Sequence, residues 1–364
     1  MKTTASISKL DMIETVYIAA LHSEGLLLQE TLANGVEVKR FKLKTRDLSK
    51  HLLVQVFKYI EFCLAVALHY RKKNIGMVNV HVLGLLPLGY LLKLLYGAKL
   101  IYDAHELETE THGLEGRRKT LVKWVERLLI HKVDRTVVVS ENIADWYAAA
   151  YGMARPTVVM NAPNRYTPPR TDHFRKTFGI REDQTILLYQ GLLDGGRGIE
   201  SILAAFSRRV DERWVVVFMG YGELEATIKR AASESRRVFF FPAVPPGKVL
   251  DYTVSADVGI ASFENSCLSQ YYVMPNKLFE YAMAGLPVIV SDMKEMRELV
   301  ERYEMGAVFA GEDPAAINDA IDRLDKMDLA VLKRNALRLA SENSWEVQEE
   351  KMLAMYRTLD GHGP

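Results

Sequence analysis

The sequence predicts an α/β protein with two doubly wound domains, each built around a parallel sheet. Three observations lead to this prediction. Short apolar or β-branched runs alternate with amphipathic stretches of helix length, the pattern of repeated strand–helix–strand units. The run NAPNRYTPPRTD at residues 161–172 has no periodicity and divides this series in two. The chain of 364 residues is also longer than the roughly 100 to 200 residues of one domain.

Residues 1–163 form the predicted N-terminal domain. Apolar or β-branched runs predict strands at residues 15–21, 36–43, 77–82, 99–105, 135–140 and 157–161. The amphipathic stretches between them predict helices near residues 50–73, 84–96, 115–131 and 140–150.

Residues 164–342 form the predicted C-terminal domain. The same patterns predict strands at residues 185–191, 214–220, 238–244, 257–263, 287–292 and 307–310. They predict helices at residues 197–208, 222–234, 247–255, 276–284 and 293–302. Two Rossmann-like domains of this kind, facing each other, leave a crevice at the carboxyl ends of both sheets, where such folds bind ligands.

The last segment, residues 343–364, is predicted to be a helix that crosses back to the first domain. Its apolar residues recur at helical spacing: Trp345, Met352, Met355, Tyr356 and Leu359. An exposed tail would not need this apolar stripe, so we expect the helix to pack on another part of the protein.

The composition is that of a soluble globular protein, with 49% hydrophobic and 26% charged residues. Cys63 and Cys267 lie far apart and have no metal-ligand spacing, which argues against a disulfide framework or a zinc site and favours a cytoplasmic setting. The N-terminus has no basic region followed by an apolar core, so it does not resemble a signal peptide. Polar residues and breakers interrupt the apolar stretch 77–102, and we predict no membrane-spanning helix.

The charge is distributed unevenly along the chain. Residues 1–170 contain 24 Lys and Arg against 16 Asp and Glu, a net charge of +8, and the remainder carries −7. The basic half, with RKK at 71–73 and RRK at 117–119, suggests attraction to an anionic membrane or to a phosphate-bearing acceptor. The alternative is that these residues only solvate the surface. Basic residues do not alternate with aromatic residues on a strand, so no nucleic-acid module is predicted.

A glycine-rich turn follows the predicted strand 185–191. The glycines of the stretch from Gly191 to Gly198 allow the backbone to approach a ligand closely, and a helix N-terminus follows them. Arg197 can bind two phosphate oxygens in bidentate fashion, so the turn predicts an anion site. The alternative is a plain turn with a solvated arginine. The stretch matches neither the Walker P-loop nor the dinucleotide fingerprint.

We expect two further segments to lie beside this turn. Gly220 permits a tight turn after the next strand. In the segment PNKLFE, Asn276 is the predicted N-cap and Lys277 lies in the first helical turn, where its charge opposes the helix dipole. A bound anion would relieve that conflict, and Glu280, on the same helical face, could accept hydrogen bonds from sugar hydroxyls. Alternatively, Lys277 and Glu280 are an ordinary surface pair.

In the predicted first domain, His81 and His105 each follow a strand, and Asp103 and Glu106 flank His105. Histidines at neighbouring strand ends would point toward the crevice and suit proton donation near neutral pH. They could equally be structural. The sequence has no D-x-D and no acidic cluster with metal-ligand spacing, so we predict that no metal is used.

Taken together, several motifs resemble the GT-B glycosyltransferases of family 4: YDAHELE, VVVSENIADWY, YQGLLDGGRGIESILAAF, FMGYGELE, ADVGIASF, PNKLFEYAMAGLPVIVSD and SWEVQEEKMLAMYRTL. The PNKLFEYAMAGLPV block is the most specific, and the resemblance covers nearly the whole chain. It implies a retaining, metal-independent transfer of a sugar from a nucleotide-sugar to an acceptor. The donor would bind the second domain and the acceptor the first.

The resemblance also implies roles for individual residues. Arg197 and the turn from Gly191 to Gly198 would bind the diphosphate, and Glu280 would hold the ribose. Asn276 and Lys277 would line the sugar and the diphosphate, and the backbone near Val244 would meet the base. His105 would lie under the reacting sugar and stabilise an oxocarbenium-like transition state.

The sequence departs from the family pattern in three places. Tyr272 stands where a first glutamate is common, and Leu192 replaces an arginine that would accompany Arg197, so Lys277 is expected to supply that charge. The stretch 15–21 resembles the family's second strand, and only about a dozen residues precede it, which suggests a shortened acceptor side.

The leading hypothesis is a cytoplasmic-face glycosyltransferase of polysaccharide or glycoconjugate assembly. It would use a UDP- or GDP-sugar and a glycan or lipid-linked acceptor. One alternative is a non-hydrolysing sugar-nucleotide epimerase of similar architecture. Another is a non-catalytic, transferase-like protein that binds a partner glycosyltransferase or a membrane surface.

Overall fold

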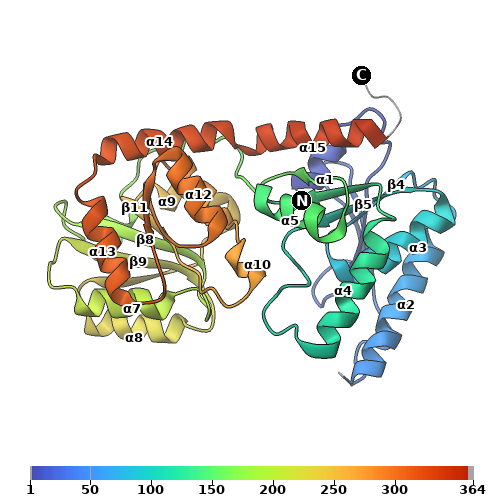
Figure 1. The fold of residues 1–364 in the computed structure, drawn as a ribbon, viewed down its shortest axis with the longest axis horizontal. Coiled ribbons are helices and arrows are strands. Elements are labelled where there is room, and N and C mark those ends of the chain that lie inside the picture. Colours follow the sequence, from blue (N-terminus) through green and yellow to red (C-terminus); the bar gives the residue numbers. More distant parts are fainter. Residues whose placement is uncertain (1, 50, 360–364) are drawn as a thin grey trace.

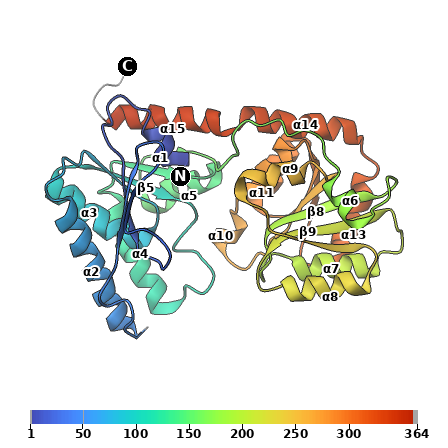
Figure 2. The same cartoon turned by 180° about the vertical axis from the view of Figure 1, so that it is seen from behind.

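The structure, a computed structural model, describes residues 2–49 and 51–359. Two α/β units lie side by side, and two long helices run in line along one edge of both (Figure 1). Figure 2 shows the same arrangement from behind. The two-domain α/β architecture predicted from the sequence is confirmed.

The N-terminal unit contains two sheets. One has the order β4-β5-β6-β7 and is entirely parallel. The other has the order β1-β3-β2, in which β1 pairs with β3 in parallel and the short β2 pairs with β3 in antiparallel orientation. The strands are β1 (Tyr17–Leu21), β2 (Gln29–Thr31), β3 (Glu37–Phe41), β4 (Met77–Val80), β5 (Lys99–Ala104), β6 (Arg135–Val138) and β7 (Thr157–Val158). All six strands predicted for this region form, and β2 was not predicted.

The four longer helices of this unit follow the predicted amphipathic stretches, whereas the short α1 was not predicted. They are α1 (Lys2–Ile7), α2 (Leu52–Tyr70), the 3-10 helix η1 (Leu83–Leu85), α3 (Leu86–Tyr96), α4 (Gly116–Ile130) and α5 (Glu141–Tyr151). Gly97 and Gly152 end α3 and α5 in the left-handed conformation that favours glycine. One face of α2 is buried through Phe62 and Val66 in a core shared with β3 and α3.

Helix α2 bears on the prediction that no helix spans a membrane. The segment Leu53–Tyr70 has a mean hydropathy of 1.3 and is, by length and composition, apolar enough to cross a membrane. This helix lies outside the apolar stretch 77–102 on which the prediction rested. Only 28% of Leu53–Tyr70 is buried inside the protein, so most of this apolar helix lies at the surface.

The C-terminal unit has one parallel sheet with the order β10-β9-β8-β11-β12-β13. Its strands are buried apolar runs, as expected for a parallel sheet covered by helices on both faces. They are β8 (Thr185–Leu192), β9 (Trp214–Tyr221), β10 (Val238–Pro242), β11 (Val258–Ala261), β12 (Val288–Ser291) and β13 (Gly306–Phe309). All six correspond to predicted strands.

The helices of this unit include several that were not predicted. They are α6 (His173–Phe178), α7 (Ile199–Arg208), α8 (Glu225–Glu234), the 3-10 helix η2 (Pro246–Lys248), α9 (Val249–Thr253), α10 (Leu268–Tyr271), α11 (Asn276–Met283), α12 (Lys294–Tyr303), α13 (Pro314–Leu324) and α14 (Leu329–Glu342). Helices α6, α10, α13 and α14 are the additions. The start of α14 is stabilised by Asp328, whose side chain accepts from the backbone N–H of Ala330.

Helix α15 (Trp345–Leu359) crosses to the N-terminal unit, as predicted. Trp345, Met352 and Tyr356 are buried against α1 and against the strands β5 and β6. The Tyr356 hydroxyl accepts a hydrogen bond of 2.8 Å from Asn79 Nδ2, at the surface of β4. Because α14 packs on the C-terminal unit and α15 on the N-terminal one, the two helices fix the units relative to each other.

Direct contacts also join the facing ends of the two units. Ser269, in α10, donates through Oγ to Glu106 Oε2 at 3.1 Å and through its N–H to the Glu110 carbonyl at 3.2 Å. Asn142, at the start of α5, donates its N–H and its side-chain amide to Glu295 and Glu298 of α12.

Candidate functional site

The glycine-rich turn leads from β8 into α7 and lies against β9 and β11. Gly191 pairs with Gly220 across the two strands, and a Cβ atom on Gly220 would lie 1.8 Å from the Gly191 carbonyl oxygen. Gly198 is the N-cap of α7 with φ of 64°, and a Cβ atom there would lie 1.9 Å from Ser262 Oγ. Only glycine allows these close approaches, so the turn is held tightly around the N-terminus of α7.

Two cations converge beside this turn. The Arg197 guanidinium lies 5.5 Å from the centre of the Phe263 ring, and Lys277 Nζ lies 5.6 Å from the same ring. Lys277 Nζ also lies 3.7 Å from the centre of the Tyr189 ring. Since residues 197 and 277 come from different helix starts, their proximity is a product of the fold.

Lys277 is buried, and its Nζ has no hydrogen-bond partner in the described structure. Burial, together with the positive charge of Arg197, lowers the pKa of Lys277 from 10.5 to about 7, while Glu280 acts in the opposite direction. A buried ammonium group without a hydrogen-bond acceptor is costly. An anion bound between Lys277 and Arg197 would supply the missing acceptor.

The prediction that Asn276 is the N-cap is wrong. Pro275 occupies that position with extended backbone angles, and the exposed Asn276 is the first residue of α11. No side chain caps the helix, because proline has no polar group to accept from the first-turn N–H groups. Those groups remain available to a ligand on the side where Asn276 and Lys277 lie.

Glu280, one turn further along α11, is oriented by a chain of hydrogen bonds. Its Oε2 accepts from Gln190 Nε2 at 2.5 Å, and Gln190 Oε1 accepts from Thr253 Oγ1 at 2.8 Å. Burial raises the pKa of Glu280, while the hydrogen bond from Gln190 and the charge of Lys277 act to lower it. The carboxylate is therefore fixed near the turn, within the electrostatic influence of Lys277, rather than lying in a surface ion pair.

Two other predicted donor-side positions are less constrained. Val244 lies between β10 and η2 and is half-buried against the core. Tyr272 is half-buried at the end of α10, where its ring lies 5.3 Å from that of Tyr271. The Lys294 ammonium lies 5.8 Å from the Tyr272 ring.

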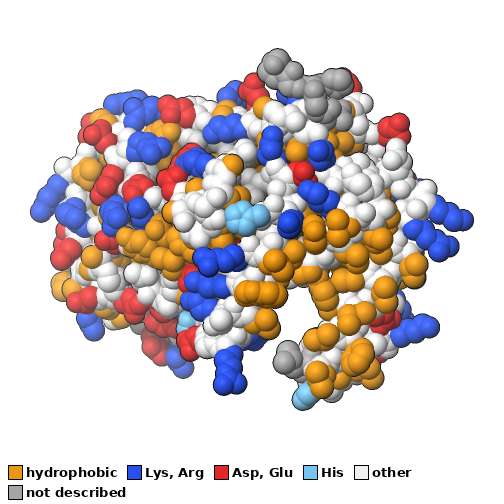
Figure 3. All heavy atoms as spheres, turned by 45° about the vertical axis from the view of Figure 1, so that its right-hand side comes forward, with side chains coloured by type: hydrophobic (Ala, Val, Ile, Leu, Met, Phe, Trp, Pro, Cys, Tyr) orange, Lys and Arg blue, Asp and Glu red, His pale blue; other side chains and the backbone are white. Residues whose placement is uncertain are grey.

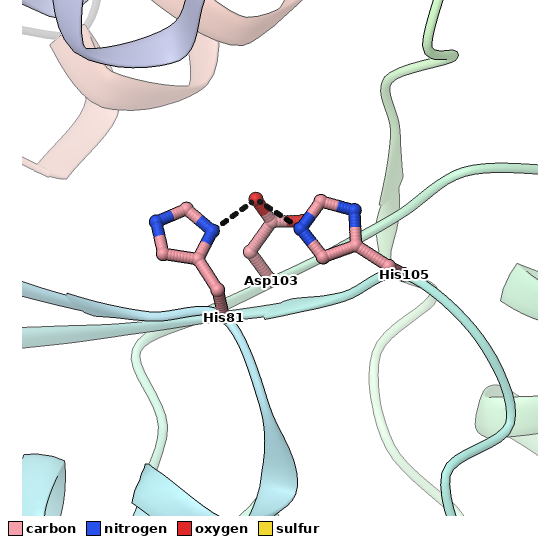
Figure 4. A group of neighbouring side chains, drawn as sticks. All are labelled: His81, Asp103 and His105. Atoms are coloured by element: carbon pink, nitrogen blue, oxygen red, sulfur yellow. Dashed lines mark hydrogen bonds and ion pairs between the residues drawn. The ribbon is translucent and has the colours of Figure 1, made fainter. Parts of the chain in front are cut away.

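On the facing unit, His81 follows β4 and His105 follows β5, so the predicted placement at strand ends is correct. Their side chains lie on either side of Asp103 (Figure 4). His81 Nδ1 lies 3.0 Å from Asp103 Oδ2, and His105 Nε2 lies 3.6 Å from the same oxygen. The two rings are stacked with centroids 5.8 Å apart. The buried Asp103 carboxylate thus orients two exposed imidazoles, whereas Glu106 is engaged with Ser269.

These three residues bear on the prediction that no metal is used, which rested on the absence of D-x-D and of an acidic cluster with metal-ligand spacing. Among the described residues, His81, Asp103 and His105 form one group that could hold a metal ion, with ligand atoms within 4.8 Å of one another. Imidazole and carboxylate ligands suit ions such as zinc or manganese. Spacing along the sequence did not reveal the group, because adjacent parallel strands bring residues 81 and 103 together. Metal-independent catalysis stays a prediction.

A pocket of about 470 Å³ lies between the start of α3 and helix α4. Glu108 lines it and accepts a hydrogen bond of 2.8 Å from the backbone N–H of Leu83, two residues after His81. Burial raises the pKa of Glu108 to about 7, against the effect of that hydrogen bond. Nothing in the sequence distinguished Glu108 from its acidic neighbours. The apolar side chains of the pocket are Leu83, Pro87, Leu114, Leu121, Val122 and Val125.

Two family models match the chain on either side of the linker. The model described as Glycosyltransferase Family 4 matches residues 15–162, and the model described as Glycosyl transferases group 1 matches residues 184–326. The chain belongs to the group 1, family 4 glycosyltransferases. Both cations, Arg197 and Lys277, lie in the group 1 part of this glycosyltransferase, and the His81–Asp103–His105 group lies in the family 4 part.

The relatives that the sequence matches are glycosyltransferases of low sequence identity. The D-inositol 3-phosphate glycosyltransferase 1 of Catenulispora acidiphila is 24% identical over 253 residues, which cover 64% of this chain and 59% of that protein. The probable glycosyltransferase WbjE of Pseudomonas aeruginosa is 22% identical over 331 residues, 87% of this chain and 82% of that one. The match thus spans less than two thirds of the length of the first of these relatives.

Solved structures confirm the GT-B fold. The sucrose-phosphate synthase from Thermosynechococcus elongatus superposes with a TM-score of 0.78 at 16% identity, over 99% of this chain and 92% of that one. HepE from Anabaena, solved in complex with UDP, superposes with a TM-score of 0.67 at 14% identity, over 89% and 87% of the two chains. At these identities the likeness concerns the fold alone.

Proposed function

We propose that this glycosyltransferase transfers a sugar, with retention of configuration and without a metal ion, from a UDP- or GDP-sugar to a glycan or lipid-linked acceptor. The reaction would serve polysaccharide or glycoconjugate synthesis at the cytoplasmic side of a membrane. The observation that carries the proposal is the convergence of Arg197 with the buried, unpartnered Lys277 beside the N-terminus of α7.

The donor diphosphate would lie between these two cations. The Arg197 guanidinium can donate to two oxygens of one phosphate, and the backbone N–H groups at the start of α7 offer further donors. Lys277 would supply the second cation that Leu192 does not provide. Its ammonium is already desolvated, so the phosphate would gain a charge-assisted hydrogen bond without a further cost of removing water from the lysine.

The nucleoside and the sugar would extend from the diphosphate in opposite directions. Glu280, held by Gln190, is suited to accept hydrogen bonds from ribose hydroxyls, and the backbone around Val244 would contact the base. Asn276 and the uncapped first turn of α11 would face the sugar. HepE, which shares this fold, is known in complex with UDP, and this favours a uridine donor.

Transfer would take place between this donor and the histidine pair. The bond from the anomeric carbon to the diphosphate oxygen breaks, and the acceptor oxygen attacks from the same face. The acceptor proton passes to the leaving phosphate oxygen. Arg197 and Lys277 would stabilise the developing phosphate charge, and His105, oriented by Asp103, would face the oxocarbenium-like sugar.

The pocket that Glu108 lines between α3 and α4 bears on the acceptor. A purely hydrophilic glycan would gain nothing from the apolar side chains that line it, whereas the hydrocarbon part of a lipid-linked acceptor would. Arg118, at the same pocket, could meet an acceptor phosphate. These features favour the lipid-linked class.

A thermal-shift screen of UDP-, GDP- and ADP-sugars in the presence of EDTA tests the donor proposal. We expect one nucleotide class to raise the unfolding temperature, and Arg197→Ala to remove most of that rise. No response to any of them would contradict the proposal. Analysis of the donor after incubation without acceptor separates transfer from epimerisation, since only an epimerase would convert the sugar under those conditions.

A further inference from the structure

The outer faces of α2, α3 and α4 carry an unusual number of exposed apolar side chains. Among the described residues 24 large hydrophobic side chains are exposed, and half of them lie on these helices, six on α2 and three each on α3 and α4. We call this set the three-helix surface. Figure 3 shows hydrophobic side chains gathered over this part of the N-terminal unit, around a hollow. The members are Leu53, Val56, Phe57, Ile60, Leu64, Leu68, Leu91, Leu94, Leu95, Leu121, Trp124 and Leu128.

These side chains form rows along the helices. Positions 53, 57, 60, 64 and 68 of α2 lie on one helical face, and positions 121, 124 and 128 lie on one face of α4. The opposite face of α2 is buried through Phe62, Cys63 and Val66, so the outer row is not needed for the core of the domain. Phe57 and Trp124 are 64% and 60% exposed. An exposed apolar surface of this extent usually marks a contact site.

Each of the two rows ends in a positive charge, although the exposed Glu115 lies just before Arg117. Arg71 continues the row of α2 at its C-terminal end, and Arg117 begins the row of α4 at its N-terminal end. Both arginines are exposed, and neither has an ion-pair partner in the described part of the chain. The carboxylates of the same helices are occupied, because Glu61 accepts from backbone N–H groups of residues 44 and 45 and Glu126 is buried among tyrosine hydroxyls.

We propose that the three-helix surface docks on an anionic lipid bilayer. The apolar rows of α2 and α4 enter the headgroup and upper acyl region, and Arg71 and Arg117 extend from the row ends to lipid phosphates. An apolar row that ends in a long, unpaired arginine fits a bilayer interface, where hydrocarbon and phosphate lie in adjacent layers. Helix α2 does not cross the bilayer, since its inner face remains packed in the core.

This inference goes beyond the proposed transfer reaction and does not depend on it. Leu121 belongs both to the three-helix surface and to the pocket that Glu108 lines, so the docked surface adjoins the pocket proposed for the acceptor. Vesicle binding requires neither donor nor acceptor. A failure of docking would therefore leave the donor proposal untouched, and a failure to bind nucleotide-sugar would leave docking untouched.

Trp124 provides a test on the unmodified protein. Of the four tryptophans, all within the described residues, only Trp124 is exposed. With vesicles of phosphatidylcholine and phosphatidylglycerol in equal parts at low salt, we expect a blue shift of tryptophan emission and quenching by brominated acyl chains. Vesicles of phosphatidylcholine alone should give a weaker response, because the arginines then lose their anionic partners.

Variants separate the two components of binding in a flotation assay with the same vesicles. The double variant Phe57→Gln, Leu64→Gln should lower the partition coefficient at least tenfold. Arg71→Gln, Arg117→Gln should lower it roughly 30-fold at low salt, from the typical contribution of two arginines near an anionic surface. The control Val210→Gln, Met327→Gln removes exposed apolar side chains far from the three helices and should bind like the unmodified protein.

Unchanged Trp124 emission together with no flotation of the unmodified protein would overturn the proposal. So would flotation that both surface variants retain. Concentration-dependent oligomers that the Phe57 and Leu64 changes dissolve, without vesicle binding, would instead assign the surface to a protein contact. Thermal unfolding verifies that each variant is folded, and if one is not, the emission of the unmodified protein decides by itself.

Discussion

Replacing Lys277 by methionine should stabilise the unliganded protein and abolish donor binding. Methionine preserves the length and apolar character of the side chain but removes the ammonium group. That group is buried, has no hydrogen-bond acceptor and lies near a second cation, Arg197. Lys277 therefore destabilises the folded protein, and we attribute its presence to a role in binding phosphate.

The size of the effect follows from the pKa of the buried amine. Its decrease from 10.5 to about 7 corresponds to on the order of 5 kcal/mol between the charged and neutral forms in the folded protein. At pH 7 the cost to folding is about 4 kcal/mol, because half of the population has already lost its proton. Glu280 loses the favourable charge of Lys277 in the variant, so we expect a net gain of about 2 to 4 kcal/mol in the free energy of unfolding.

The dependence on pH has a defined sign. The folded lysine holds fewer protons than the unfolded one between pH 7 and 10.5, so the stability of the unliganded protein should rise with pH in this window. A bound diphosphate restores the charged form and raises the pKa of Lys277. Donor binding should therefore take up a proton, and the affinity should fall as the pH rises above 7, by at most tenfold per pH unit.

Calorimetric titration of UDP at pH 8, in two buffers with different ionisation enthalpies, measures this proton uptake directly. Thermal unfolding of the unliganded Lys277→Met variant at pH 6, 7 and 9 measures the gain in stability, which should shrink toward pH 9. Arg197→Ala is the matched control, since it should weaken UDP binding without a comparable gain, its side chain being only half-buried. A variant that is less stable than the unmodified protein at pH 6, or UDP binding without proton uptake, would refute the reasoning.

Four further predictions concern the rest of the site. Asp103→Asn should lower kcat more than tenfold and alter the pH profile of activity, because His81 and His105 lose their orienting carboxylate. The KM for the donor should change little, and an unaltered pH profile would count against this role of Asp103. Activity should survive EDTA, and added zinc should inhibit the unmodified enzyme but not the His81→Gln variant. If EDTA abolished activity and zinc or manganese restored it, the His81–Asp103–His105 group would instead be a catalytic metal site. Glu280→Gln should weaken binding of the nucleotide by about 1 to 3 kcal/mol, seen as a higher Kd by titration, whereas unchanged affinity would exclude it from the donor site. Gly220→Ala should destabilise the protein by about 1 to 3 kcal/mol in thermal or urea unfolding, since the new Cβ atom would meet the backbone of the neighbouring strand. An unchanged stability would show that the strands can separate there.

Much of the fold was predictable because it depends on local patterns. Buried parallel strands appear as continuous apolar runs, and every predicted strand is present in the structure. The stripe from Trp345 to Leu359 correctly predicted a packed helix that crosses to the other unit. The N-cap at Asn276 was wrong by one residue, because proline before a helix can occupy the capping position without offering a side-chain cap.

The sequence by itself determined the family, the two α/β units and the glycine turn that contains Arg197, because these depend on residues close together in the chain. Only the tertiary structure decided that Lys277 is buried without a partner beside Arg197, and that Asp103 lies between His81 and His105. It also decided which face of α2 remains exposed, since that helix is apolar on both sides. Burial and proximity depend on how distant segments pack, and no local pattern along the chain records them.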